Sequence, residues 1–148
     1  MAAGDILKEA GLVVEAFTVK ASEDIEKGEL VVNDGNGILA ATAAGSVVGK
    51  VMMALEAHDY SEEATHQISC VVFGCVEAQK VSGSGAAKKG QKLMLSATAG
   101  ECTLFVKGDV TATVNQTTAN AALDNNAGAF GFSAADSVDA DTTQKMWL

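Results

Sequence analysis

The stretch Leu30-Val-Val-Asn-Asp-Gly-Asn-Gly-Ile-Leu-Ala-Ala41 indicates the fold class, because it reads as two short strands joined by a tight turn. Its Asp-Gly and Asn-Gly pairs are the residues that most readily adopt the positive φ angles of hairpin turns. Short apolar runs flank the turn on both sides, at Leu30–Asn33 and Ile38–Ala41. The stretch therefore predicts a β-hairpin.

The same pattern extends along most of the chain from Leu12 onward. The hydrophobic period is close to two, valine and threonine are frequent, and Gly, Asn, Asp and Ser clusters interrupt the runs. About ten short strands with close turns predict an all-β fold, a small barrel or sandwich. The expected strands are Leu12–Lys20, Leu30–Asn33, Ile38–Ala41, Val47–Leu55, Gln67–Phe73, Val76–Val81, Lys92–Ser96, Cys102–Lys107, Val110–Val114, Ala129–Ala134 and Thr143–Leu148.

Three cysteines, Cys70, Cys75 and Cys102, lie in these strand-like runs. Their odd number, and the absence of the CxxC spacing of redox and zinc sites, favours reduced thiols in an intracellular compartment. Free cysteines behave mostly as small buried apolar residues. We therefore expect all three in the core.

The N-terminal residues differ from the rest, so we expect an arm at 1–11 and a single β domain at 12–148. Asp5 could cap a short helix over Ile6–Ala10, although so short a helix is marginal unless it packs on something. Apolar residues in and after this arm offer surface that a lone barrel need not bury. These candidate contacts with a neighbouring subunit or a partner are Ile6, Leu7, Leu12, Val13, Val14 and Phe17.

Composition excludes several classes of protein. The 148 residues include no arginine and no proline, and ten lysines stand against 19 acidic residues, for a formal net charge of −9. Nucleic-acid binders need clustered cations, so no nucleic-acid partner is expected. A hydrophobic fraction of 48% excludes wholesale disorder. The longest apolar stretch, Ile38–Gly49, is far short of the roughly 20 residues of a membrane span, and no membrane association is expected.

Candidate catalytic chemistry is weak. His58 and His66 bracket a segment that also holds Asp59, Glu62 and Glu63, but no HxH or HExxH spacing places two ligands on one face. We interpret the segment as a solvated turn. No GxSxG elbow is present, and the lysine-rich loop at 85–92 lacks the Lys-Ser/Thr of a phosphate loop. We expect no catalytic residue, no cofactor and no metal, and hence no enzyme.

A weak internal similarity links two parts of the chain. Ile25–Val32 is echoed about 62 residues later by Ala87–Leu95, and Gly49–Ala57 has a shorter counterpart in Gly131–Ala135. The similarity is explained either by ordinary β-turn composition or by a duplication. Two copies are too few for a solenoid, so a duplication would mean two related halves that close one barrel.

The order of several motifs resembles that of a known family. The motifs are Lys27-Gly28-x-Leu30-Val31, the hairpin Asp34–Gly37, the segment Val48-Gly-Lys-Val-Met-Met-Ala-Leu-Glu-Ala-His-Asp-Tyr60, the run Val76–Gly83 and Lys89-Gly-x-Lys-Leu93. From about Ala16 to Leu148 the chain resembles the head decoration, or cement, proteins of tailed bacterial and archaeal viruses. Those are small β-barrel proteins that bind the outside of an HK97-type capsid.

The resemblance implies a homo-oligomer, commonly a trimer, with the major capsid protein as partner. It implies a protein made in the host cytoplasm, located on the exterior of the virion, and stabilising the head by bridging capsid subunits. A charge of −9 per copy fits this side of the shell, because it would repel a packaged genome. The alternatives are a tail or fibre β-domain, or a small ligand-binding or hydrolytic β-barrel that uses His58 and His66.

Overall fold

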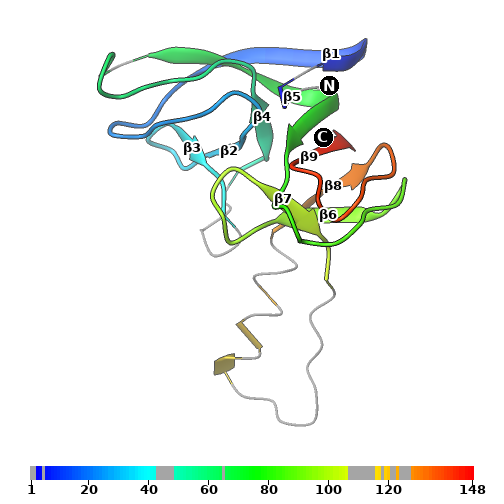
Figure 1. The fold of residues 1–148 in the computed structure, drawn as a ribbon. Helices are drawn as coiled ribbons and strands as arrows, with labels where there is room; N and C mark the ends of the chain where they lie inside the picture. Colours follow the sequence, from blue (N-terminus) through cyan, green and yellow to red (C-terminus); the bar gives the residue numbers. More distant parts are fainter. Residues whose placement is uncertain are drawn as a thin grey trace.

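The structure, a computed structural model, is nearly all β, as the sequence predicts. Nine strands form one curled antiparallel sheet within the described part of the chain (Figure 1). None of the described helical residues belongs to a helix long and apolar enough to cross a membrane. The described residues are 3–4, 6–42, 49–64, 66–106, 116–117, 119–120, 123 and 128–148, with only the backbone for 6–10.

Each observed strand overlaps a predicted run. The predicted strand Val110–Val114 lies outside the described residues. The observed strands are β1 (Ile6–Thr18), β2 (Leu30–Asn33), β3 (Ile38–Ala40), β4 (Met52–Ala54), β5 (Gln67–Gln79), β6 (Lys92–Leu95), β7 (Cys102–Leu104), β8 (Ala129–Ser133) and β9 (Thr143–Trp147). β4 and β7 are shorter than the predicted Val47–Leu55 and Cys102–Lys107, and β1 begins before the predicted Leu12.

The helix predicted over Ile6–Ala10 is wrong, because this segment is the start of β1. β1 runs antiparallel along β5, from Ile6 opposite Val76 to Thr18 opposite Gln67. Pairing with a long strand outweighs the local capping signal, since a helix of one or two turns has little stability of its own.

The two strands predicted on either side of Gly74 are one strand, β5. Gly74 has a φ of +148°, and a Cβ at this position would lie 2.8 Å from Cδ1 of Leu12. Glycine therefore lets β5 continue while β1 crosses it closely. The sequence suggests a strand break at Gly74, but in the fold this glycine allows β5 to continue and to pair with β1.

The sheet contains the same five-strand arrangement twice. Its strand order, β3-β2-β4-β5-β9-β8-β6-β7, is β3-β2-β4-β5 followed by the counterpart β7-β6-β8-β9 in reverse. The fifth strand of each arrangement follows the same rule: β1 pairs with the start of β5, and the end of β5 pairs with β9, so the end of β5 is the counterpart of β1. We call β1 to β4 with the start of β5 the first half, and the end of β5 with β6 to β9 the second half.

Individual hydrogen bonds recur at equivalent positions of the two halves. In the turn before β2, Gly28 N donates to Ala54 O and Ala54 N to Glu29 O (2.8 and 2.9 Å), and in the turn before β6, Gly90 N donates to Ser133 O and Ser133 N to Gln91 O (both 2.8 Å). Lys20 N donates to Ile38 O in the first half as Val81 N donates to Cys102 O in the second (2.9 and 3.1 Å). A side-chain cap matches as well, with Glu26 N donating to Glu29 Oε2 and Lys88 N to Gln91 Oε1 (2.9 and 2.7 Å). The similarity of Ile25–Val32 and Ala87–Leu95 therefore reflects a duplicated fold.

Two apolar clusters fill the described part of the chain. One lies inside the first half and includes Ile25, Ile38 and Ile68. The other joins Leu30 and residues of the same sheet face in the first half to the interior of the second half, including Leu93. Backbone bonds reinforce this junction, since Leu30 N donates to Gly100 O at 2.7 Å. The second half therefore covers one face of the first.

The β2–β3 turn provides a test of close backbone packing. Gly35 and Gly37 both have positive φ, +97° and +133°, but an added Cβ meets nothing within 4 Å at Gly35 and lies 2.7 Å from Lys20 N at Gly37. We expect Gly35→Ala to lower the free energy of unfolding by about 1 kcal/mol and Gly37→Ala by about 3 kcal/mol or more. Urea unfolding of both variants measures the difference, and equal losses would contradict this account of the turn.

Candidate interaction surface

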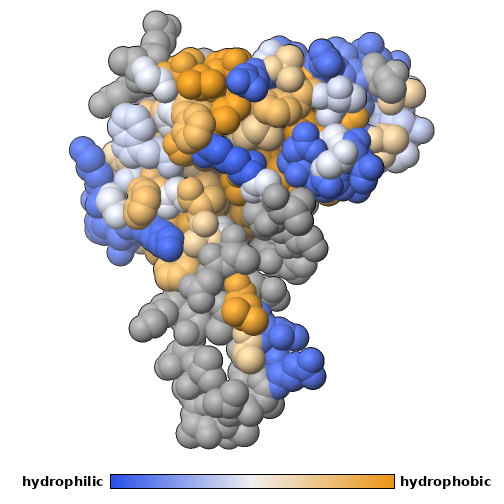
Figure 2. Space-filling view, turned by 180° about the vertical axis from the view of Figure 1, so that it is seen from behind, coloured by the Kyte–Doolittle hydropathy of each residue, from blue (hydrophilic) through white to orange (hydrophobic). Residues whose placement is uncertain are grey.

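Val13 and Val14 are the predicted contact residues that the structure exposes, at 40% and 42%. Val13 lies directly opposite Phe73 of β5, which is 50% exposed. The β1–β5 register shifts between Val13 and Val14, which marks a bulge. Val13, Val14 and Phe73 thus form an exposed apolar area that we call the β1 patch. Figure 2 shows orange apolar surface gathered on one face of the molecule and bordered by hydrophilic residues.

A lysine borders the β1 patch. Lys50 Nζ lies 4.3 Å from the centroid of the Phe73 ring, a cation–π contact, and partial burial lowers the pKa of Lys50. Sequence reasoning missed Phe73 as a surface residue. The alternation that puts Ile68, Cys70 and Val72 on one face would have placed Phe73 on the other.

The remaining predicted contact residues are less accessible. Leu12 and Phe17 are half-buried and pack against the two core clusters. Ile6 and Leu7 lie in β1, and their side chains are outside the described residues. Of the four candidates whose side chains the structure describes, it thus brings Val13 and Val14 together on the surface.

The solvated turn predicted around the histidines is wrong for His58, which is only 6% exposed. Its backbone pairs with Ile25 in both directions, at 2.9 and 2.8 Å, and its Nδ1 lies 2.9 Å from Glu23 O. His66 is half-buried, with Nδ1 2.9 Å from Glu63 Oε2 and its ring 5.6 Å from that of His58. The non-local pairing with Ile25 is what buries His58.

Carboxylates gather beside His58. Asp59 Oδ1 accepts the backbone N–H and the hydroxyl of Ser61, at 2.8 and 2.6 Å, and these bonds lower the pKa of Asp59. Across the described part of the chain, no three His, Cys, Asp or Glu side chains are arranged to hold a metal ion. We call this surface the acidic hollow; it has a volume of about 400 Å³, and its polar lining comprises Asp24, Glu26, His58, Asp59 and Glu62.

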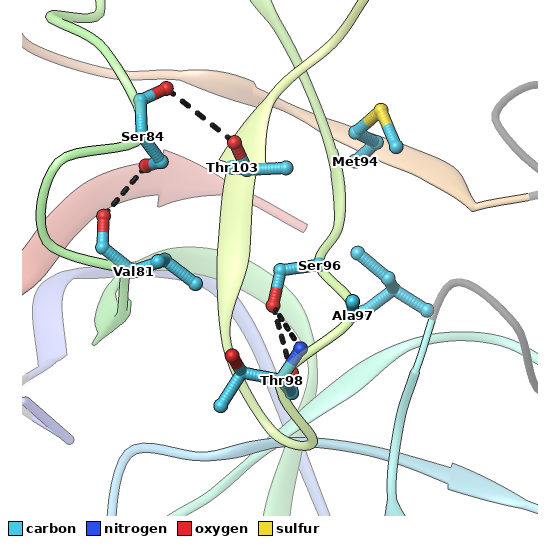
Figure 3. A pocket seen from close by; sticks show the side chains of 8 residues that line it. Val81, Ser84, Met94, Ser96, Ala97, Thr98 and Thr103 are labelled. Atoms are coloured by element: carbon cyan, nitrogen blue, oxygen red, sulfur yellow. Dashed lines mark hydrogen bonds between the residues drawn. The ribbon is translucent and has the colours of Figure 1, made fainter.

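A second hollow, of about 350 Å³, lies beside the β6–β7 hairpin (Figure 3). Two of its hydroxyl groups donate to nearby main-chain carbonyls: Ser84 Oγ to Val81 O at 2.6 Å, and Ser96 Oγ to Thr98 O at 2.8 Å. Thr103 Oγ1 donates to Ser84 O at 3.5 Å. The two serine hydroxyls therefore fix the shape of their own loops, and the Thr103 hydroxyl joins β7 to the loop that holds Ser84.

Comparison with known proteins identifies no relative: no family model matches the chain, and neither the curated proteins nor the solved structures include a match.

All three cysteines are buried, as the sequence predicts. Cys70 and Cys102 have no exposed surface, and burial raises the pKa of each thiol to about 12. The reactive thiolate is therefore almost absent near neutral pH.

We expect Cys70 and Cys102 of the folded protein to be unreactive toward Ellman's reagent at pH 8, because burial blocks both access and ionisation. Denatured protein, the control, should release three equivalents per chain. The rate of release from folded protein should follow unfolding. Rapid labelling of either cysteine, located by mass spectrometry, would contradict the burial.

Proposed function

We propose that this chain is a decoration protein on the exterior of a tailed-virus capsid, where it stabilises the head by bridging copies of the major capsid protein. The observation that carries the proposal is the β1 patch, Val13, Val14 and Phe73. Contiguous exposed apolar surface of this kind marks interaction sites. Two of its three residues lie on β1, a thirteen-residue strand that, among the described strands, pairs only with β5.

Sequence resemblance gives the proposal its biological setting. Lys27-Gly28 and Lys89-Gly90, two of the motifs shared with decoration proteins, are the equivalent turns that precede β2 and β6. Both motifs thus belong to the duplicated framework of the fold. A decoration protein of this kind would act as a homo-oligomer, a trimer in the family that the chain resembles.

The physical basis would be burial of apolar area at several contacts at once. Apolar surface removed from water stabilises a complex by about 25 cal/mol per Å². An oligomer that binds two or more capsid subunits gains further affinity, because the second contact forms at a high effective concentration. The net charge of −9 favours the outer surface of a shell that encloses nucleic acid.

The test uses expanded, undecorated capsids of the parent virus. We expect the purified protein to co-sediment with them and to raise their resistance to heat and chelator. Val13→Thr with Val14→Thr keeps side-chain shape and strand propensity but replaces two apolar methyl groups with hydroxyls, and it should weaken binding at least about tenfold. Val138→Thr, at a 61% exposed position outside the β1 patch, is the matched control.

Absence of capsid binding by the folded protein would overturn the proposal. Equal binding by the Val13/Val14 variant and the control would remove the β1 patch from the contact. Assembly of the protein alone into tubes or stacked rings, seen by electron microscopy, would favour a tail or fibre module instead.

A further inference from the structure

The first half buries a row of apolar side chains on one face of its sheet. Leu30 lies opposite Met53, and Met53 lies opposite Val71, so these three side chains form a cross-strand row. Each has 0% exposure, within the cluster that joins the two halves. The duplicated fold provides the same three positions in the second half.

At those equivalent positions stand Lys92, Phe132 and Trp147, which again form a cross-strand row. Here the row is on the surface, since Phe132 is 51% and Trp147 40% exposed. Lys145 lies on the same face, two residues before Trp147 in β9. We call Lys92, Phe132, Lys145 and Trp147 the aromatic–lysine face.

The composition of this face is typical of protein–protein contacts, in which large aromatic side chains supply most of the binding energy and charged residues surround them. Lys92 Nζ lies 4.8 Å from the centroid of the Phe105 ring, so its charge is held beside the aromatic surface. Glu77 faces Lys145 from β5 but is only 6% exposed, and it presents little negative surface.

The chain itself carries a surface of complementary charge. The carboxylates of the acidic hollow belong to four exposed residues, Asp24, Glu26, Asp59 and Glu62. His58 lines the same hollow, and its Nε2 atom, buried, has no hydrogen-bond partner among the described residues. In Figure 1 the connection between β4 and β5 lies at the left of the molecule and β8 with β9 at the right, so the two surfaces are distinct. Glu26 of the hollow lies beside the end of β5, since its Oε2 accepts from Gln79 Nε2 at 3.4 Å and Gln79 pairs with Thr143 of β9.

We infer that the aromatic–lysine face of one copy binds the acidic hollow of a second copy, head to tail. Because the two surfaces differ, the contact is heterologous, and its repetition closes a ring if the rotation between neighbours allows closure. A stable contact of this kind buries about 800 Å² on each partner. The inference deepens the proposed function, because it assigns the contact between copies to two named surfaces, and it can be tested without a capsid.

The sole tryptophan of the chain is Trp147, which makes the contact directly measurable. We expect the wild-type protein to be an oligomer by light scattering at micromolar concentration. Dilution to the monomer should shift the Trp147 emission to longer wavelength, because the indole returns to water. A protein that is monomeric throughout this range would overturn the inference.

Charge reversal tests each surface separately. Lys92→Glu with Lys145→Glu alters the face, and Glu26→Lys with Glu62→Lys alters the hollow. Asp24 and Asp59 are left intact, because their carboxylates bond the backbone N–H groups of Tyr60 and Ser61. Each double variant should weaken association at least tenfold. Lys27→Glu with Lys89→Glu is the matched control, with both lysines exposed and outside the two surfaces.

Mixing distinguishes a head-to-tail contact from a symmetric one. The face variant keeps an intact hollow and the hollow variant keeps an intact face, and the two reversed surfaces also complement each other, so an equimolar mixture should re-associate into oligomers in which the two variants alternate. The fourfold variant with both reversals should recover the oligomer. Thermal unfolding confirms that each variant is folded.

Two results would overturn the assignment of surfaces. One is a hollow variant that associates like the wild type, which would indicate that the face binds itself or another site. The other is quenching of Trp147 by a single-stranded oligonucleotide at physiological salt, which would assign the aromatic–lysine face to nucleic acid.

Discussion

Pairing along β5 is the interaction on which the rest of the structure depends. Its first part, residues 67–71, lies between β1 and β4, and its last part, residues 75–79, pairs with β9. One strand therefore belongs to both halves, and their relative placement follows from the single chain that runs through Gly74. The junction cluster around Leu30 and Leu93 forms because β5 brings the two curled sheets together.

Duplication allowed the two halves to diverge at equivalent interior positions. Ile68 in the first half corresponds to Gln144 in the second, and both are almost fully buried. The amide of Gln144 donates to Ser133 Oγ at 2.9 Å and accepts from Ser137 Oγ at 2.6 Å. A buried polar group of this kind is tolerated because its hydrogen bonds are made.

A charged residue shows the same divergence. Val19 of the first core corresponds to Lys80, which is 2% exposed. The Lys80 ammonium donates to three main-chain carbonyls, of Val81, Asp139 and Asp141, at 3.2 to 3.3 Å. These bonds tie two loops together. The first half thus has an apolar interior, whereas the second uses polar groups to hold its loops.

The sequence predicts those features that are set locally. The hairpin at Leu30–Ala41 and the alternation in Gln67–Phe73 depend on turn chemistry and a period of two, and both are confirmed. Gly74, by contrast, acts through the approach of Leu12, a contact between segments far apart in the chain. The burial of His58 depends on pairing with Ile25. The structural equivalence of Ile68 and Gln144 cannot be recognised from the sequence, because one is apolar and the other polar. Non-local contacts account for each of these differences.

The acidic charge and the missing proline are connected through the edges of the sheet. Proline is one of the usual means of preventing edge strands from pairing indiscriminately, and this chain has none. A charge of −9 opposes contact between copies in most orientations, although salt screens it over about 8 Å at physiological ionic strength. Only an orientation that places lysines against carboxylates escapes this repulsion at close range. Net negative charge over the molecule, with Lys92 and Lys145 beside the aromatic rings of the aromatic–lysine face, therefore favours contacts that use this face over random aggregation.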